Sequence, residues 1–236
     1  MSVRPALLNA VTGWLFILGS ACFVVGSVPA FASAVGGLVD GITYFVGSIF
    51  FTAASLAQLL QAQSPAMTGV DEVGQHTRAP VRLWNWLPHD RGWLAAITQF
   101  PGTLFFNIST LAALTHNASA AEENRYVWRP DLFGSTLFLV ASAFGVLAVS
   151  ERFFSLRTPS IPWRIAWLNM VGSILFMASA LASYVIPSTD ELVSTRVAVA
   201  GTLLGAVCFL SGAALMFPAW RQALRPAPGS LRPELR

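Results

Sequence analysis

The residues best suited to chemistry in this sequence are His89 and Asp90, an imidazole next to a carboxylate. Such a pair can act as a general acid and base in proton transfer. Adjacent side chains rarely face each other, however, and Pro88-His89-Asp90 is also typical of a turn that leads into a helix N-cap. We therefore expect these residues to open a helix, and we predict no catalytic residues.

Motifs for other chemistry are absent from the sequence. It has no Gly-rich phosphate loop, no metal-spaced cluster of His and Cys, no Gly-x-Ser-x-Gly and no HExxH. Cys22 and Cys208 both lie in apolar segments, where they suit neither a disulfide framework nor a zinc site. We predict no metal and no cofactor.

The composition predicts a membrane protein. The chain of 236 residues is 55% hydrophobic and 11% charged, about half the charge of a typical soluble domain. Six stretches lack Asp, Glu, Lys and Arg, and each is close to or above the roughly 20 residues that a helix needs to cross a bilayer. They are residues 5–39, 41–70, 92–121, 132–150, 165–189 and 197–220. We expect an all-α membrane protein with six transmembrane helices.

The arginines predict the orientation. Eleven of the 14 basic residues, all Arg, fall in the termini and in two of the five loops, and Arg125, Arg129 and Arg196 fall in the other loops. Because basic residues favour the cytoplasmic side, both termini are expected in the cytoplasm. The basic isoelectric point then follows from topology, so we predict membrane lipid and no nucleic acid as a partner.

The first stretch also resembles a cleavable signal peptide, with Arg4, an apolar run and Ala30-Phe31-Ala32-Ser33-Ala34. It carries the same repeated pattern as the other five stretches, which a discarded peptide would not need. We therefore predict a retained first helix.

That pattern is a Gly, then a small residue, then a Phe four positions after the Gly, once in each stretch. The six glycines are Gly19, Gly47, Gly102, Gly134, Gly172 and Gly205, and the six phenylalanines are Phe23, Phe51, Phe106, Phe138, Phe176 and Phe209. Residues seven and eight positions after each Gly are also small, so each helix has one smooth face. Such faces pack membrane helices closely; a pore or ligand cavity lined by this face is the alternative. We predict three tandem two-helix repeats.

Three positions before each Gly, the residue on the same face is less uniform: Phe16, Tyr44, Gln99, Asp131, Asn169 and Thr202. The topology puts Gln99 and Asn169 toward the cytoplasmic end and Asp131 and Thr202 toward the outer end. Asn107 is the deepest strongly polar residue. Because polar groups in the membrane need partners, interhelical hydrogen bonds or a polar pocket are expected at Gln99, Asn107, Asp131, Asn169 and Thr202.

The repeats define the expected organisation. The three repeats are residues 1–63, 92–150 and 165–220, separated by a cytoplasmic linker at 64–91 and a cytoplasmic loop at 151–164, and followed by a disordered tail at 221–236. Aromatic residues near the expected membrane surfaces, Trp84, Trp86, Trp93 and Trp128, are predicted to be interfacial.

The segment Trp167-Leu168-Asn169-Met170-Val171-Gly172-Ser173 resembles the YrhK-like domain of bacterial membrane proteins. The resemblance is best over residues 165–218, fair over 92–150 and looser over 12–63, and the third helix departs from it with Gln99 and Thr103. The family carries no established chemistry to transfer. The resemblance implies only the helical-pair fold and a location in the bacterial cytoplasmic membrane.

Three classes of function remain. We expect most a non-enzymatic scaffold, sensor or complex subunit, with a homo-oligomer or another membrane protein as partner, because the repeat is dominated by packing. The second is a carrier or channel for a small neutral or lipophilic molecule. The third is a lipid-modifying enzyme, which would need His89, Asp90, Asn107 and Arg129 to cluster. For the scaffold we expect the phenylalanines to fill the bundle, so that no continuous cavity reaches Gln99, Asn107 or Asn169 from either side.

Overall fold

The computed structural model describes residues 2–64, 67, 77–115, 119–150 and 160–224. Long helices account for most of them: α1 (Pro5–Gly26), α2 (Pro29–Ala62), α3 (Arg91–Thr115), α5 (Arg129–Val149), α6 (Ile161–Ala182) and α7 (Thr195–Ala223). The tail predicted to be disordered begins at residue 221, but α7 continues to Ala223. Residues 225–236 of that tail, and most of the predicted loop at 151–164, lie outside the described residues.

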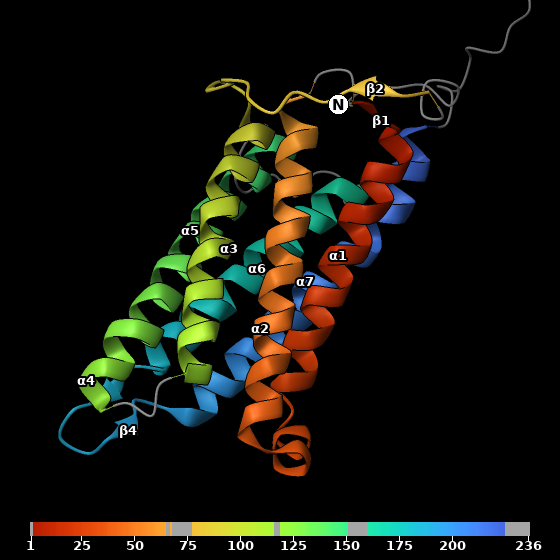
Figure 1. The fold of residues 1–236 in the computed structure, drawn as a ribbon. Helices are drawn as coiled ribbons and strands as arrows, with labels where there is room; N and C mark the ends of the chain where they lie inside the picture. The colour runs from red at the N-terminus through yellow and green to blue at the C-terminus, as the bar shows by residue number, and fades with distance from the viewer. Residues whose placement is uncertain (1, 65–66, 68–76, 116–118, 151–159, 225–236) are drawn as a thin grey trace, which may run out of the picture.

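The helices form a closed ring (Figure 1). Each of the six long helices packs against the next one along the chain, and α7 closes the ring by packing against α1. We call the end that holds Pro5 and Ala62 the N-terminal end, and the end that holds Gly26 and Pro29 the opposite end. Consecutive helices run in opposite directions, so each short link between α1 and α2 or between α3 and α5 lies at the opposite end.

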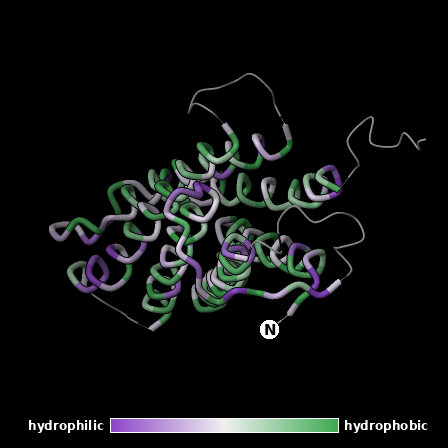
Figure 2. The backbone as a smooth tube through the Cα atoms, turned by 90° about the horizontal axis from the view of Figure 1, so that it is seen from above, coloured by the Kyte–Doolittle hydropathy of each residue, from purple (hydrophilic) through white to green (hydrophobic). Residues whose placement is uncertain are grey.

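Apolar helices give the chain the character of a multi-pass membrane protein. Five described segments are long and apolar enough to cross a membrane: Pro5–Gly26, Pro29–Ala62, Ala120–Val149, Ile161–Ala182 and Thr195–Ala223. Most of the helical backbone in Figure 2 is green, the colour of hydrophobic residues. The expected third span, α3, is not among the five, because Gln99, Pro101 and Asn107 lower its hydropathy.

Helix starts follow local sequence signals. Pro5 and Pro29 occupy the first turns of α1 and α2, where a missing N–H is tolerated. Asp90 caps α3, since its Oδ1 accepts a hydrogen bond of 2.9 Å from the Trp93 N–H. The prediction that Asp90 opens this helix is therefore confirmed.

The second helix is longer than its uncharged stretch. It begins at Pro29 and includes Asp40, with a break at Gly36, where φ is +80°. A residue without a Cβ adopts this left-handed conformation at little cost. The first uncharged stretch, 5–39, therefore contains all of α1 and the beginning of α2.

A π-helical turn joins two helices at the opposite end. Residues Asn124–Trp128 form this turn between α4 (Ala120–Glu123) and α5. Pro130 is the second residue after it. Its ring would clash with a carbonyl four residues earlier in a regular helix, and a wider turn relieves that clash.

Two short two-stranded sheets complete the fold. At the N-terminal end β1 (Ser2–Val3) pairs antiparallel with β2 (Ala79–Pro80). At the opposite end β3 (Val185–Ile186) pairs antiparallel with β4 (Glu191–Leu192). The β3–β4 pair is a hairpin, and Asn124 fixes it, because its side chain both donates to the Val185 carbonyl and accepts from the Val185 N–H.

Candidate functional site

Six phenylalanines form the centre of the ring. Phe23, Phe51, Phe106, Phe138, Phe176 and Phe209 are all buried and belong to one apolar cluster. Neighbouring rings lie with centroids between 5.1 and 6.3 Å apart, mostly in edge-to-face arrangements. We call this cluster the phenylalanine barrier.

The barrier has two layers. Phe51, Phe138 and Phe209 come from α2, α5 and α7, and all three pairs of their rings are in contact. The other layer consists of Phe23, Phe106 and Phe176, from α1, α3 and α6. Because consecutive helices run in opposite directions, the same sequence position falls on opposite sides of the ring's middle in neighbouring helices.

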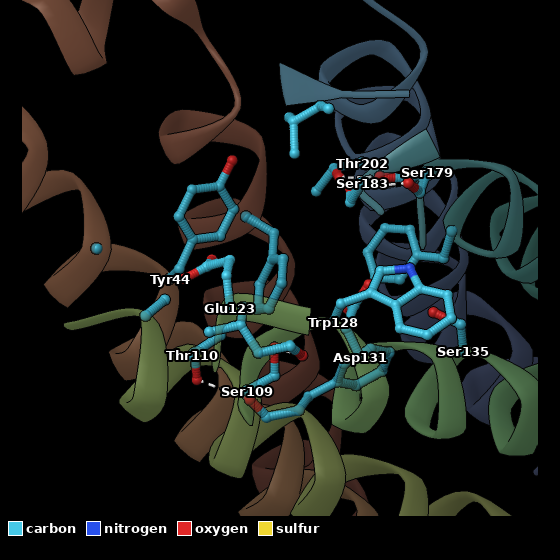
Figure 3. Close-up of a pocket in the computed structure, with 17 residues that line it drawn as sticks. Tyr44, Ser109, Thr110, Glu123, Trp128, Asp131, Ser135, Ser179, Ser183 and Thr202 are labelled. Carbon is cyan, nitrogen blue, oxygen red and sulfur yellow. Dashed lines mark hydrogen bonds between the residues drawn. The ribbon is translucent and has the colours of Figure 1, made fainter. Parts of the chain in front are cut away.

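A cavity of about 330 Å³ lies at the opposite end and borders the layer of Phe23, Phe106 and Phe176. Its polar lining includes the carboxyl groups of Glu123 and Asp131 and the hydroxyl groups of Tyr44 and Thr202. Figure 3 shows these side chains around the space, with Trp128 beside Asp131. We call it the acidic cavity. It falls within the range of about 300–1,000 Å³ typical of ligand pockets.

A smaller cavity of about 100 Å³ lies on the other side of the barrier, against Phe51, Phe138 and Phe209. Three amide side chains line it, from Gln58, Gln99 and Asn169, and we call it the amide cavity. A groove of about 400 Å³ near the N-terminal end shares Gln58 and Asn169 with it. The amide cavity has room for several water molecules.

The expectation that no cavity reaches Gln99, Asn107 or Asn169 is wrong for two of the three. Gln99 and Asn169 both line the amide cavity. The six phenylalanine side chains fill only the middle of the space that the six helices enclose. Beyond each layer, small residues such as Gly212 and Ser135 leave space that no large side chain fills.

The six residues that lie three positions before each Gly are divided equally between the linings of the two cavities. Tyr44, Asp131 and Thr202 line the acidic cavity, whereas Phe16, Gln99 and Asn169 line the amide cavity. Each set comes from alternate helices. The position that varies most within the repeated face therefore faces a cavity.

Hydrogen bonds hold the rim of the acidic cavity. The Tyr44 and Ser27 hydroxyls lie 2.8 Å apart, and the Thr202 and Ser179 hydroxyls lie 2.7 Å apart. The Trp128 indole N–H donates to the Ala180 carbonyl at 2.8 Å. These bonds orient the walls of the cavity from α1, α2, α6 and α7.

Asn107 lies outside the lining of both cavities. Its side-chain N–H donates to the Thr52 hydroxyl at 2.8 Å, across the interface between α3 and α2. Its Oδ1 is buried and has no hydrogen-bond partner among the described residues. The side chain thus joins the neighbouring helices α3 and α2.

The residues that an enzyme would need are not brought together. His89 and Asp90 are exposed at the N-terminal end, where Asp90 serves as a helix cap. Arg129 is exposed at the opposite end, after the π-helical turn. No group of three or more His, Cys, Asp and Glu side chains in the described ranges could hold a metal ion.

The four tryptophans predicted to be interfacial have different surroundings. Trp84 and Trp86 are exposed, at 71% and 66%. Trp93 is only 2% exposed and contacts the Trp86 ring at 5.3 Å. Trp128 lines the acidic cavity.

Two cavity residues had no signal in the repeat. Gln58 lies eleven positions after Gly47, three turns along the same face, so following the face further along α2 would have revealed it. The sequence places Glu123 in a loop between two apolar stretches. It reaches the cavity only because α4 and the π-helical turn extend α5 toward the opposite end.

Comparisons of this chain with protein-family models, with curated proteins and with solved structures gave no match. The resemblance to the YrhK-like domain therefore stays a prediction.

Proposed function

We propose that this protein is a membrane carrier that binds a small amphipathic molecule within its helix ring. The observation that carries the proposal is the pair of cavities on either side of the phenylalanine barrier. A carrier needs a binding space that is closed from one side by a removable obstacle. A scaffold needs no such space.

The lining supports an amphipathic ligand. Aromatic rings, including Phe23, Phe106 and Phe176, form the floor of the acidic cavity, and hydroxyl and carboxyl groups form its walls. Ligand pockets typically combine apolar walls with a few oriented polar groups. A lipid-modifying enzyme is less well supported, because the residues it would use lie at different ends of the ring.

The proposal includes the architecture in the membrane. We infer that α3 also crosses the bilayer, which gives six spans, because it packs between α2 and α5 along the ring. Its polar residues Gln99 and Asn107 face a cavity and the neighbouring helix α2, respectively, and not lipid. Three tandem repeats, a location in the bacterial cytoplasmic membrane and both termini in the cytoplasm remain part of this proposal.

The cavities can be tested by cysteine accessibility in a variant without Cys22 and Cys208. Single cysteines at positions 99 and 169 should react with a membrane-impermeant thiol reagent added to the cytoplasmic side. Single cysteines at positions 131 and 202 should react only from the outer side. A cysteine at Ala206, which is fully buried, is the matched control and should stay unreacted.

The same experiment tests the scaffold. The positive controls are Leu83→Cys before α3 and Glu191→Cys in the link between α6 and α7, two exposed positions outside the helices. If all four cavity cysteines stay unreacted from both sides while these controls show that the reagent reaches each side of the protein, the carrier proposal is wrong and the scaffold is favoured.

A further inference from the structure

We propose that the acidic cavity selects a small organic ammonium ion, that is, a protonated amine on an apolar body. This inference rests on the proposed carrier function and adds the chemical class of the ligand. It is carried by the charge of the cavity, its aromatic floor, and the place of Asp131 in the repeat.

The charge of the cavity has one sign. Glu123 and Asp131 are the ionisable carboxyl groups that line it, and its described lining contains no Arg, Lys or His. Within the described part of the chain, the Asp131 carboxyl has no hydrogen-bond or ion-pair partner. Acidic groups inside a membrane bundle are costly without a partner and commonly mark a pathway for a cation.

The aromatic floor favours an organic cation over a metal ion. Phe23, Phe106, Phe176, Tyr44 and Trp128 all line the cavity. The negative faces of such rings attract ammonium groups and also bury an apolar body. A hard metal ion would instead require about six oxygen ligands close together, and the described residues hold no group of three acidic, His or Cys side chains placed for a metal.

The repeat shows that packing does not require the carboxyl group of Asp131. Tyr44, Asp131 and Thr202 occupy the same position in α2, α5 and α7, and all three line the cavity. Two of the three copies have a hydroxyl group there. A carboxyl group in the remaining copy adds charge at one wall, which a cationic ligand would use.

The amide cavity, on the other side of the barrier, also offers a hydrogen-bond acceptor. Gln58 Oε1 is buried, has no hydrogen-bond partner among the described residues, and belongs to a side chain that lines the amide cavity. An ammonium N–H can donate to this oxygen. A protonated amine therefore finds acceptors in both cavities.

The test uses benzylammonium, with benzyl alcohol as its neutral counterpart of similar size. Binding of each radiolabelled probe is measured by equilibrium dialysis with the full chain in phosphatidylcholine nanodiscs, whose surface carries no net charge. Benzylammonium should bind about ten-fold more tightly than benzyl alcohol, a difference of about 1.4 kcal/mol. Asp131→Asn should remove that preference and leave benzyl alcohol binding unchanged.

Two variants keep the test independent of folding. Asp131→Glu keeps the charge and should keep the preference. Asp190→Asn removes an acidic residue at the same end but outside the cavity, and Asn tolerates its φ of 55°. This control should bind both probes as the unmodified protein does.

Equal binding of the two probes, unaffected by Asp131→Asn, would overturn the ammonium inference and leave the carrier proposal intact. Failure of both probes to bind would also overturn the inference. The carrier proposal itself fails only if the cysteines at positions 99, 131, 169 and 202 are inaccessible.

Discussion

The rings of Phe106 and Phe138 lie 5.1 Å apart, and each packs on the glycine of the other helix. A Cβ atom added at Gly134 would lie 3.0 Å from the Phe106 ring, and one added at Gly102 would lie 2.9 Å from the Phe138 ring. The same reciprocal contact joins Gly19 to Phe51 and Gly47 to Phe23, and joins Gly172 to Phe209 and Gly205 to Phe176. Each Gly therefore makes room for the Phe of its partner helix.

This contact predicts the effect of enlarging a glycine. We expect Gly172→Leu to lower the free energy of unfolding by about 1–3 kcal/mol, the usual range for overpacking. A Cβ atom there would lie 3.1 Å from the Gly205 carbonyl oxygen and 3.2 Å from the Phe209 ring. Thermal unfolding in detergent measures the change.

Gly145→Leu is the matched control. Gly145 lies in α5, and a Cβ atom added there would meet nothing within 4 Å. Equal melting temperatures for the Gly172 and Gly145 variants would contradict close packing at Gly172.

The hydrogen bond between Asn107 and Thr52 predicts a measurable coupling between α3 and α2. In a double-mutant cycle of Asn107→Leu and Thr52→Val, we expect a coupling of about 0.6 kcal/mol, the average for such bonds in a membrane protein. Each variant keeps the approximate size of the side chain. Ser211→Ala is a control, because its hydroxyl is exposed and donates within its own helix. Strict additivity of Asn107→Leu and Thr52→Val would show that the bond contributes nothing.

Topology gives a third prediction. Reporter fusions after residues 70, 120, 160 and 192 should report inside, outside, inside and outside, because eleven of the 14 arginines lie on one side of the predicted spans. The fusion after residue 120 depends on α3 crossing the bilayer. An inside result there, or an outside result after residue 160, would contradict the six-span arrangement.

The sequence predicts much of this fold because its strongest signal is periodic. The spacing of Gly and Phe is consistent with the packing face of each long helix, and the uncharged stretches contain most of the helical segments. The end of α1 and the start of α2 could not be placed by charge alone. Asp40 lies inside α2, where a helix that extends beyond the apolar region tolerates it.

The cavities were harder to predict, because they depend on how much space the rings leave. Periodicity identified Gln99, Asp131, Asn169 and Thr202 as facing inward, but it could not show whether packing would close over them. Glu123 enters the acidic cavity through a π-helical turn whose cause, Pro130, is visible in the sequence. The width of that turn depends on tertiary contacts such as the Trp128 hydrogen bond to Ala180.

The last prediction concerns the phenylalanine barrier itself. Phe51 is 4% exposed, and its ring contacts four others, those of Phe16, Phe23, Phe138 and Phe209. It lines the amide cavity directly. Replacing Phe51 with Ala removes the ring that touches both layers, and we expect the two cavities to become continuous.

In a variant without native cysteines, the combination of Phe51→Ala with Asp131→Cys should therefore react with an impermeant thiol reagent from both sides of the membrane, whereas Asp131→Cys alone should react from one. Replacing a buried Phe with Ala typically lowers the free energy of unfolding by about 3–5 kcal/mol. Phe51→Leu keeps more of the apolar contact, so it is made in parallel, and it should increase the reaction of the cysteine at position 131 from the second side by a smaller amount. Phe133→Ala, at a position 56% exposed on the outside of α5, should leave the reaction confined to one side. If the Phe51→Ala and Phe51→Leu variants both fold and the cysteine at position 131 still reacts from one side only, the rings around Phe51 do not form the barrier between the cavities.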